Sequence, residues 1–431
     1  MTSDRQAFQA STLLSAVRSR RTLWKAWFKV YPRAKYSPHD ATRKAARAFK
    51  SNPATNIESL QSRLSRQSFL FSPQRGVAKK RAGKTPRPVI VSPLENRIVQ
   101  RAILDVLQCP PERLKAQLAP VSRVLETPTS VGGLPGKGVP EAVNLITGAI
   151  QAGATHYIRS DIKDFFGAIP KEKVIEFIRA TTKDDAFTDF FEAALQVELA
   201  NESEIREWLS LFPRGDIGVP QGSALSALCA NILLREFDRD TNSADSTTVR
   251  YIDDFVVLAN TEQAANAAYS RGKKIMESLG LSLHDPLQHS EKASIGEVSK
   301  GFEFLSYRFM GKEVSASKAA RGKLEGMVRQ EIKDAKKTIM ENLNAPRRTS
   351  EKYIQVLSRL DRKIRGWADS FAYSTRRLEF AQLDDKIFEM LDEFSVWFYR
   401  KTKNLDKKSR RRALGIALVT DAENKGTIRE S

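Results

Sequence analysis

The sequence predicts an α+β protein in which helices flank a small antiparallel sheet. Three segments carry the β-branched or alternating patterns typical of strands: residues 155–170, 249–260 and 301–309. Apolar residues recur at helical spacing over most of the remaining chain. The order of elements is strand, helices, hairpin, helix and strand, which favours helices packed on one face of the sheet.

The composition of the chain, with 431 residues of which 41% are hydrophobic and 28% charged, is that of a soluble globular protein. No run of 18 apolar residues occurs, and the start MTSDRQAFQAS lacks the apolar core of a signal peptide. We therefore expect a cytoplasmic protein with no membrane partner. Two cysteines, and four histidines without a Cys-x-x-Cys pair, argue against a disulfide framework and against a zinc site.

The net charge of +20 is unevenly distributed along the chain. Residues 1–87 hold 20 basic and 3 acidic side chains, residues 88–314 hold 24 and 31, and residues 315–431 hold 27 and 17. The net charges of the three segments are therefore +17, −7 and +10. Ordinary solvated surface is one explanation, but a +17 segment with so few acids favours a polyanionic partner such as nucleic acid.

The N-terminal elements follow from periodicity and turn residues. Residues 11–30 are basic and amphipathic, which predicts a helix. Two arms within residues 69–93 flank a glycine-containing loop at 81–84 and predict a hairpin. Residues 94–108 are apolar at helical spacing, and a Gly/Pro-rich loop at 131–140 precedes a further helix.

The middle and C-terminal elements follow in the same way. Residues 155–170 predict a strand that runs into a turn, and helical patterns dominate residues 171–211. The segment RGDIGVPQGSALSALCANILLREF predicts a loop that opens a buried helix. A helix is predicted over residues 262–280, and the chain becomes helical and basic from about Ser315.

The segment VRYIDDFVVLAN, residues 249–260, combines a hairpin pattern with an unusual turn. Two-residue turns favour Asn-Gly or Asp-Gly because both positions need positive φ, yet Asp253 and Asp254 stand side by side here. A solvated loop is the common explanation for such a pair. However, Asp161 ends another predicted strand, and strand pairing would bring it beside Asp253. Carboxylates of this kind suit Mg²⁺, and two such ions support in-line phosphoryl transfer.

These segments resemble the motifs of reverse transcriptases. The YIDD segment resembles their Tyr-x-Asp-Asp signature. It is accompanied in family order by SDIKDFF (160–166), GVPQGSALSALCANILL (218–234), HSEKASI (289–295) and GFEFLSYRF (301–309). Upstream, RPVIVSPLENRIVQRAIL (87–104) is similar to a fingers motif of group II intron reverse transcriptases. One tetrapeptide is weakly specific, whereas six motifs in one order over residues 69–309 are highly specific.

The resemblance implies a right-hand polymerase with fingers, palm and thumb, a small antiparallel palm sheet and a helical thumb. It places basic N-terminal helices and the fingers at residues 1–154. The palm with its catalytic aspartates is expected at 155–314, including a helical part at 171–215 between fingers and palm. The helical thumb is expected at 315–400, and a basic C-terminal tail at 401–431.

The resemblance assigns catalysis to Asp161, Asp253 and Asp254. The metal site is then expected to involve Asp161, Ile162, Asp253 and Asp254, with Asp254 binding less directly. Two Mg²⁺ ions are expected there, and Mn²⁺ is a possible substitute.

The resemblance also implies a set of nucleotide-binding residues: Lys80, Arg87, Phe166, Gln221, Gly222 and Lys292. Lys80 and Arg87 would grip the triphosphate from opposite arms of the fingers hairpin. Phe166 would exclude a ribose 2′-OH, and Lys292 would protonate the pyrophosphate leaving group. Structural alternatives stay open: surface charge for Lys80, Arg87 and Lys292, core packing for Phe166, and helix capping near Ser223 for the Gln-Gly pair.

Primer and template contacts are implied for Tyr251, Gly301 and Phe302, the last two within a strand of alternating aromatics at 301–309. The segment 364–400 resembles the helical thumb of intron-type enzymes, and its aromatic stripe predicts core rather than ligand contacts. The basic cluster at 400–412 is a better candidate for binding RNA phosphates.

The chain ends soon after the predicted thumb, so we expect no DNA-binding or endonuclease domain of a full-length intron enzyme. A retron-type Asn-Ala-x-x-His motif does not occur, and PQG is kept, unlike in diversity-generating enzymes. This pattern is similar to the bacterial "unknown group" or defence-associated reverse transcriptases, with class 2 as the subgroup that it suggests. The similarity implies antiphage defence by copying a dedicated structured non-coding RNA into cDNA from dNTPs. It implies no particular protein partner.

Two other functions remain open from the sequence. A catalytically idle RNA-binding scaffold would not need three costly carboxylates, which argues against that interpretation. A group II intron-derived, maturase-like RNA-binding protein that assists splicing or retrotransposition is the second alternative. The genomic neighbourhood would distinguish it from a stand-alone polymerase.

Overall fold

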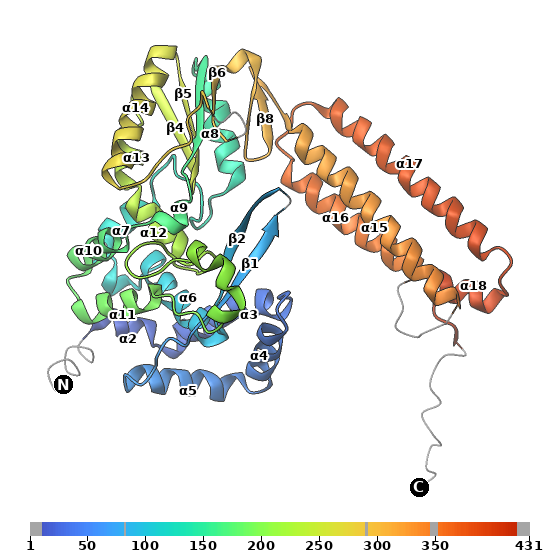
Figure 1. Cartoon of the computed structure of the whole chain (residues 1–431), viewed down its shortest axis with the longest axis horizontal. Coiled ribbons are helices and arrows are strands. Elements are labelled where there is room, and N and C mark those ends of the chain that lie inside the picture. The colour runs from blue at the N-terminus through green and yellow to red at the C-terminus, as the bar shows by residue number, and fades with distance from the viewer. Residues whose placement is uncertain (1–10, 82, 289–291, 345–351, 420–431) are drawn as a thin grey trace, which may run out of the picture. The chain divides into compact units, whose positions relative to one another are not determined.

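The computed structural model describes residues 11–81, 83–288, 292–344 and 352–419 (Figure 1). Parts of five predicted segments lie outside these described residues: residues 1–10 of the N-terminal segment, residue 82 of the hairpin loop, residues 289–291 of HSEKASI, residues 345–351 of the predicted thumb and residues 420–431 of the basic tail. The chain divides into two compact units, Met1–Glu297 and Val298–Ser431. The functional boundaries of fingers, palm and thumb stay predictions.

The N-terminal part of the first unit is helical, with α2 (Thr12–Val17), α3 (Arg20–Lys35), α4 (Asp40–Ser51) and α5 (Pro53–Ser65). The single helix predicted over residues 11–30 is therefore wrong, because the chain breaks into two helices. The break occurs at Ser19, whose backbone is extended and whose hydroxyl accepts a hydrogen bond from Thr22 N at 3.2 Å. This is an N-cap, the arrangement that serine favours over the helix interior.

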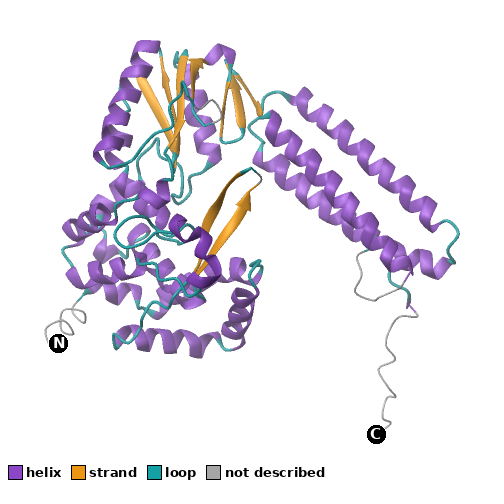
Figure 2. Cartoon of the chain, viewed as in Figure 1, coloured by secondary structure: helices purple, strands orange, loops and turns teal. Residues whose placement is uncertain are grey.

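The predicted hairpin forms from β1 (Arg75–Arg81) and β2 (Lys84–Val91), and α6 (Leu94–Gln108) follows it with the predicted bounds. Helices fill most of the remaining unit: α7 (Ala119–Leu125), α8 (Val139–Gln151), α9 (Phe165–Ala168), α10 (Lys171–Thr182), α11 (Asp185–Leu195), α12 (Ser226–Leu233), α13 (Arg235–Asp240) and α14 (Glu262–Ser278). Two short 3₁₀ helices lie at Glu112–Leu114 and Glu202–Leu211. Figure 2 shows how helices dominate over the small sheets.

The central sheet has the strand order β4-β5-β3-β6, with β3 (His156–Asp161), β4 (Ser246–Tyr251), β5 (Asp254–Ala259) and β6 (Ser294–Glu297). All three pairings are antiparallel. The predicted small antiparallel sheet is thus confirmed.

Helices cover both faces of this sheet, so the predicted packing on one face is wrong. Phe255 and Val256, neighbours on β5 that point to opposite faces, are both fully buried, as are the three residues after them. Helices α8 and α14 each pack against β5. The sequence shows the reason, because the run FVVLA is continuously apolar instead of alternating.

The second unit begins with the 3₁₀ helix Val298–Lys300 and a three-stranded antiparallel sheet of β7 (Phe302–Phe304), β8 (Tyr307–Met310) and β9 (Glu313–Ala316). The single strand predicted over residues 301–309 is therefore wrong. Leu305 and Ser306 have φ values of 50° and 69°, the left-handed pair of a tight hairpin turn. The register pairs Phe302 with Phe309, which places the aromatics on one face.

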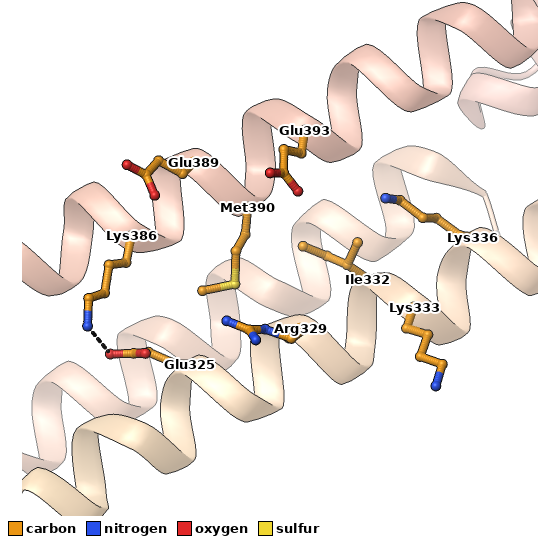
Figure 3. A pocket seen from close by; sticks show the side chains of 9 residues that line it. All are labelled: Glu325, Arg329, Ile332, Lys333, Lys336, Lys386, Glu389, Met390 and Glu393. Atoms are coloured by element: carbon orange, nitrogen blue, oxygen red, sulfur yellow. Dashed lines mark hydrogen bonds and ion pairs between the residues drawn. The ribbon is translucent and has the colours of Figure 1, made fainter.

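Four helices complete the second unit: α15 (Lys318–Asn344), α16 (Tyr353–Ser370), α17 (Arg377–Thr402) and α18 (Lys407–Leu414). The first three share one apolar core that includes Ile387 and Phe394. A groove of about 770 Å³ lies between α15 and α17 (Figure 3). Its rim mixes acids and bases, among them the Glu325–Lys386 ion pair at 3.0 Å, so its charge favours neither a polyanion nor a cation.

No helix in the described part of the chain is long and apolar enough to cross a membrane.

Candidate active site

The three predicted catalytic aspartates lie where β3 ends and β5 begins, and we call the site of Asp161, Asp253 and Asp254 the aspartate edge. Asp161, the last residue of β3, pairs directly with Asp254, the first residue of β5. Directly paired residues share a face of the sheet, so these two carboxylates start from neighbouring positions. Asp253 lies in the adjoining turn, and its carbonyl oxygen accepts a hydrogen bond from Ile162 N at 3.2 Å. Strand pairing therefore places all three aspartates together, as the sequence predicts.

The turn itself is shifted by one residue from the predicted Asp253-Asp254 pair. Because β4 ends at Tyr251 and pairs it with Asp254, the two turn residues are Ile252 and Asp253. Ile252 has a φ of 63°, in the left-handed region. A β-branched residue is a genuine outlier there, at a cost of about 1–3 kcal/mol. Such strain persists only where the surroundings hold the turn in place.

Two glycines of the Gly/Pro-rich loop hold the turn from one side. A Cβ atom on Gly132 would lie 2.8 Å from Ile252 Cγ1, and one on Gly133 would lie 3.0 Å from Ile252 Cδ1. Gly133 also has a φ of 69°, which side chains rarely adopt. Only glycine lets this loop approach the strained residue so closely.

A buried arginine also holds the turn. Arg250 is fully buried, and its Nη1 donates to the carbonyl oxygen of Ile252 at 2.8 Å. Its Nε and Nη2 bond both carboxylate oxygens of the buried Asp238, at 2.6 and 2.5 Å. Nη2 also donates to Ser130 Oγ at 2.8 Å and to Asn231 Oδ1 at 2.9 Å. The strained turn is thus fixed by a bidentate, desolvated ion pair.

Four residues that hold the turn were not predicted from the sequence: Arg250, Asp238, Asn231 and Gly132. One signal could have found the arginine, because it stands inside the otherwise apolar arm of a buried hairpin. A charge in that position needs a partner.

The electrostatics of the edge favour a bound cation. Burial raises the pKa of the Asp254 carboxyl to about 7, against the opposing charge of Arg159, and the neighbouring Asp161 and Asp253 add to the rise. Burial, followed by the charge of Asp161, also raises the pKa of Asp253. Ionisation of these carboxylates is therefore unfavourable in the folded protein, and a bound cation would offset that unfavourable free energy.

Three of the predicted nucleotide-binding residues lie at this edge. Lys292 Nζ pairs with Asp161 Oδ2 at 2.6 Å, and the two side chains are 50% and 20% exposed. Arg87 on β2 donates from Nε to Gln221 Oε1 at 2.6 Å, and its charge also acts on Asp253. The hairpin of β1 and β2 is further joined to the PQG loop by Ile90 N and Gln221 O, 3.2 Å apart.

The other predicted nucleotide-binding residues have distinct surroundings. Phe165 is buried, whereas Phe166 is half-buried, and its carbonyl oxygen accepts from Val219 N of the PQG loop at 2.8 Å. Gly222 is exposed with a φ of 118°, which explains the glycine at that position. Lys80 is exposed at an irregularity of β1, on the arm opposite Arg87. The nucleotide contacts of all these residues stay predictions.

The predicted primer and template residues lie in both units. Tyr251 is half-buried at the end of β4. Gly301 and Phe302 belong to the second unit, where Phe302 is buried and its ring stacks on Phe309 at 5.2 Å. The ring of Phe302 is therefore part of a core, and a primer contact by these residues stays a prediction.

Residues 77–309, more than half of the chain, match the family model described as reverse transcriptase (RNA-dependent DNA polymerase). The chain belongs to this reverse transcriptase family. The matched region contains the aspartate edge, the PQG loop and most of the hairpin of β1 and β2.

Two curated proteins are similar to this reverse transcriptase. The "Uncharacterized 91 kDa protein in cob intron" of Schizosaccharomyces pombe is 28% identical over 182 residues, which cover 42% of this chain and 20% of that protein. Protein YkfC of Escherichia coli is 24% identical over 298 residues, which cover 60% of this chain and 72% of YkfC. The chain thus spans about a fifth of the first relative and most of the second.

Solved structures that are similar to this chain include a partial Cas6-RT-Cas1–Cas2 complex, which is 22% identical to it with a TM-score of 0.34. That comparison covers 63% of this chain and 43% of the other. The family assignment rests on the sequence match.

Reverse transcriptases depend in general on divalent metal ions, and the aspartate edge fits one. Among the described residues, no three His, Cys, Asp or Glu side chains form a ready metal-binding group. Mg²⁺, however, is usually held by one or two carboxylates together with substrate phosphates and water. Asp161 and Asp253 supply such a pair of carboxylates. Burial and the charge of Asp161 raise the pKa of Asp253, and a divalent cation would offset this repulsion. Ile162 could contribute only its carbonyl oxygen.

Proposed function

We propose that this chain is an RNA-directed DNA polymerase that copies an RNA template into cDNA from dNTPs. The observation that carries the proposal is the edge where Asp161, Asp253 and Asp254 meet beside Lys292 and Arg87. Carboxylates for a metal and cations for a triphosphate are the two requirements of nucleotidyl transfer, a phosphoryl-transfer reaction.

In this proposal each residue acts on a stated part of the reaction. Asp161 and Asp253 would hold two Mg²⁺ ions, with Asp254 and the Ile162 carbonyl oxygen beside them. When bound, the ions stabilise the attacking and leaving oxygens of an in-line displacement. Arg87 and Lys80 bind the triphosphate, and Gln221 keeps Arg87 in place through their hydrogen bond.

Lys292 has two partners in succession in this proposal. It pairs with Asp161 in the free protein. With substrate present it gives a proton to the pyrophosphate oxygen as the bond to the α-phosphorus breaks. The exposed side chain of Lys292 allows this exchange of partners.

The RNA that we propose as template is a dedicated, structured non-coding RNA, and its copying serves antiphage defence. The support is the charge of +17 over residues 1–87 and +10 over residues 315–431, more than a nucleotide requires. The similarity to the "unknown group" enzymes supports the same assignment. Because side chains cannot read the deep groove of A-form RNA, selectivity would come from the folded shape of the RNA.

A second candidate function is assistance to an intron RNA, as in a maturase-like protein. One curated relative is described as a protein in the cob intron, which favours this candidate. Intron RNA domains flanking the gene would support it.

Primer extension by the purified chain tests the polymerase proposal. We expect dNTP incorporation on an RNA template with Mg²⁺ or Mn²⁺, and none with EDTA. Absence of synthesis on every primed RNA template with either ion would contradict the proposal.

Immunoprecipitation from cells with RNA sequencing tests the dedicated template. We expect one strongly enriched structured RNA encoded near the gene, and cDNA complementary to it. Recovery of bulk RNA in proportion to abundance, before and during infection, would remove the dedicated-template claim and leave a general polymerase.

A further inference from the structure

Two segments of the first unit lie side by side near the aspartate edge. One is residues 166–171, which follow β3 in the chain, and the other is residues 214–219, which lead into the PQG loop. Val219 N donates to the carbonyl oxygen of Phe166 at 2.8 Å. The contact therefore links Phe166, for which we predict exclusion of a ribose 2′-OH, to the PQG loop.

Glycine allows these two segments to approach each other closely. Gly218 N donates to the carbonyl oxygen of Ile169 at 2.8 Å. A Cβ atom on Gly218 would lie 2.8 Å from the carbonyl oxygen of Gly167, and the φ of Gly218 is 83°. Because the contact leaves no room for a side chain, a shift of one segment would also displace the other.

Lys171 holds the far end of this contact with a buried ammonium group. Its backbone N donates to the carbonyl oxygen of Asp216 at 3.0 Å, and its Nζ donates to that of Gly215 at 2.5 Å. One residue thus binds two successive carbonyl groups of the loop tip. Gly215, Asp216 and Ile217 are exposed, whereas Lys171 is only 1% exposed. The exposed tip of the loop is therefore fixed from below by a charge inside the protein.

The burial of this ammonium group is unfavourable for the folded protein. Burial lowers the pKa of Lys171, against the opposing charge of Asp216. Its other side-chain partner is Gln196 Oε1 at 3.4 Å, which is longer than an ordinary hydrogen bond. An apolar side chain of similar length would avoid the desolvation of the charge. Stability alone therefore does not explain a lysine at this position.

We infer that Lys171 is a positioning residue for the nucleotide site. Its ammonium group fixes the loop tip at Gly215, and this sets the spacing between Phe166 and the Gln221-Gly222 pair. Lys171 acts only through the loop, because its buried side chain cannot contact a nucleotide. The inference rests on the proposed polymerase function and adds a residue that this proposal does not use. A lysine that only stabilises the fold is the alternative.

Limited trypsin digestion of the full chain, without dNTPs or metal, tests whether Lys171 holds the loop. Arg214 is exposed and precedes Gly215, so cleavage after Arg214 reports opening of the loop tip. In Lys171→Met this cleavage should be about tenfold faster, the effect of losing one hydrogen bond from a charged group. Mass spectrometry identifies the fragment that begins at Gly215. An unaltered rate of cleavage after Arg214 would overturn the inference.

A thermal melt distinguishes the loop from the whole fold. Lys171→Met should not lower the melting temperature, because it removes a buried charge. A lower melting temperature, with faster cleavage at every trypsin site, would show that Lys171 stabilises the fold as a whole and would overturn the inference.

Nucleotide incorporation on a primed RNA template tests the effect on the site. Lys171→Met should raise the KM for dNTPs about tenfold and change kcat less, because the loop must first be ordered around the nucleotide. The ratio of ATP to dATP incorporation should also change, since the spacing from Phe166 is no longer fixed. Faster cleavage after Arg214 with an unaltered KM and ratio would leave Lys171 a structural role and overturn the inference.

Lys173→Met is the matched control, because Lys173 is an exposed lysine of the same helix α10. It should match the unaltered chain in cleavage, melting temperature and KM. If the unaltered chain makes no DNA, the polymerase proposal alone fails, and equilibrium dialysis with dATP replaces the KM. A weaker affinity for dATP in Lys171→Met than in Lys173→Met would then support the inference, and equal affinities would overturn it.

Discussion

Two ion pairs near the aspartate edge have almost the same length and opposite surroundings. Arg250 and Asp238 lie 2.5 Å apart with their side chains 0% and 3% exposed. Lys292 and Asp161 lie 2.6 Å apart with 50% and 20% exposure. The buried pair cannot exchange partners without leaving a bare charge in the core, whereas the exposed pair can. The length of a charge pair therefore says little about its behaviour, and its burial decides whether its members can exchange partners.

The largest expected effect comes from breaking the buried pair. Arg250→Ala leaves Asp238 buried without its partner, and the free energy of unfolding should fall by about 3–5 kcal/mol. Chemical denaturation measures the loss. The control is Arg239→Ala, which removes the neighbouring arginine from its exposed pair with Asp240 and should leave the free energy of unfolding almost unchanged.

The double variant Arg250→Met/Asp238→Leu separates the effect of the buried ion pair on stability from the positioning of the turn by Arg250. Apolar replacement of a buried ion pair is often neutral, so stability should largely return. DNA synthesis should remain impaired, because the hydrogen bond from Arg250 to the Ile252 carbonyl is still missing. Full activity in the double variant would show that the arginine has no positioning role.

A somewhat smaller effect is expected from the pKa of Asp254. Its folded-state value of about 7 lies above the ordinary 3.8, so the folded chain binds this proton more tightly than the unfolded chain. The stability contributed by protonation is present below about pH 4 and is lost as the pH rises through 7, by about 4 kcal/mol in total. Denaturation in EDTA at pH 5 and pH 8 should show about 3 kcal/mol of this loss, the part that falls above pH 5.

Asp254→Asn should remove most of this pH dependence and raise stability at pH 8. Adding Mg²⁺ to the unaltered chain should also flatten the dependence, since a cation favours the ionised carboxylates. A pH dependence of the same size in Asp254→Asn would assign it to other groups.

Two neighbouring phenylalanines also differ in burial, since Phe165 is buried and Phe166 is half-buried. Phe166→Ala opens space beside the proposed sugar position and should raise the ratio of ATP to dATP incorporation about tenfold or more. The matched variant Phe165→Leu changes a buried ring and should lower stability without changing that ratio. Unchanged discrimination in Phe166→Ala would place Phe166 with the core.

The smallest effect on stability is expected at the exposed pair. Lys292→Ala should change the free energy of unfolding by less than about 1 kcal/mol, because solvent screens the pair. DNA synthesis should slow, because the substitution removes the proposed proton donor to the pyrophosphate. An unchanged rate of DNA synthesis in Lys292→Ala would contradict the proposed proton transfer.

Much of this architecture could be predicted from local patterns. The bounds of α6 and the pairing of Asp161 with the hairpin both follow from periodicity and from the position of a carboxylate at a strand end. The family resemblance, now supported by the sequence match over residues 77–309, added the order of the motifs.

Wrong predictions occur where contacts with residues far along the chain override the local conformational preference. Nothing beside Ile252 in the sequence announces a positive φ, because the support comes from Gly132, more than a hundred residues away. The second face of β5 is covered by α8, another remote segment. The turn of β7 and β8 uses Leu305 and Ser306 where glycine or asparagine is usual.

DNA synthesis by Asp253→Asn tests the central claim most directly, namely that the turn carboxylate holds a catalytic metal. The substitution keeps the shape of the side chain and removes its charge. Mg²⁺-dependent dNTP incorporation on a primed RNA template should be abolished, while the thermal melt stays as cooperative as that of the unaltered chain. Asp245→Asn, an exposed aspartate ahead of β4, is the matched control and should retain full synthesis. Retained synthesis in Asp253→Asn would contradict the metal-site account.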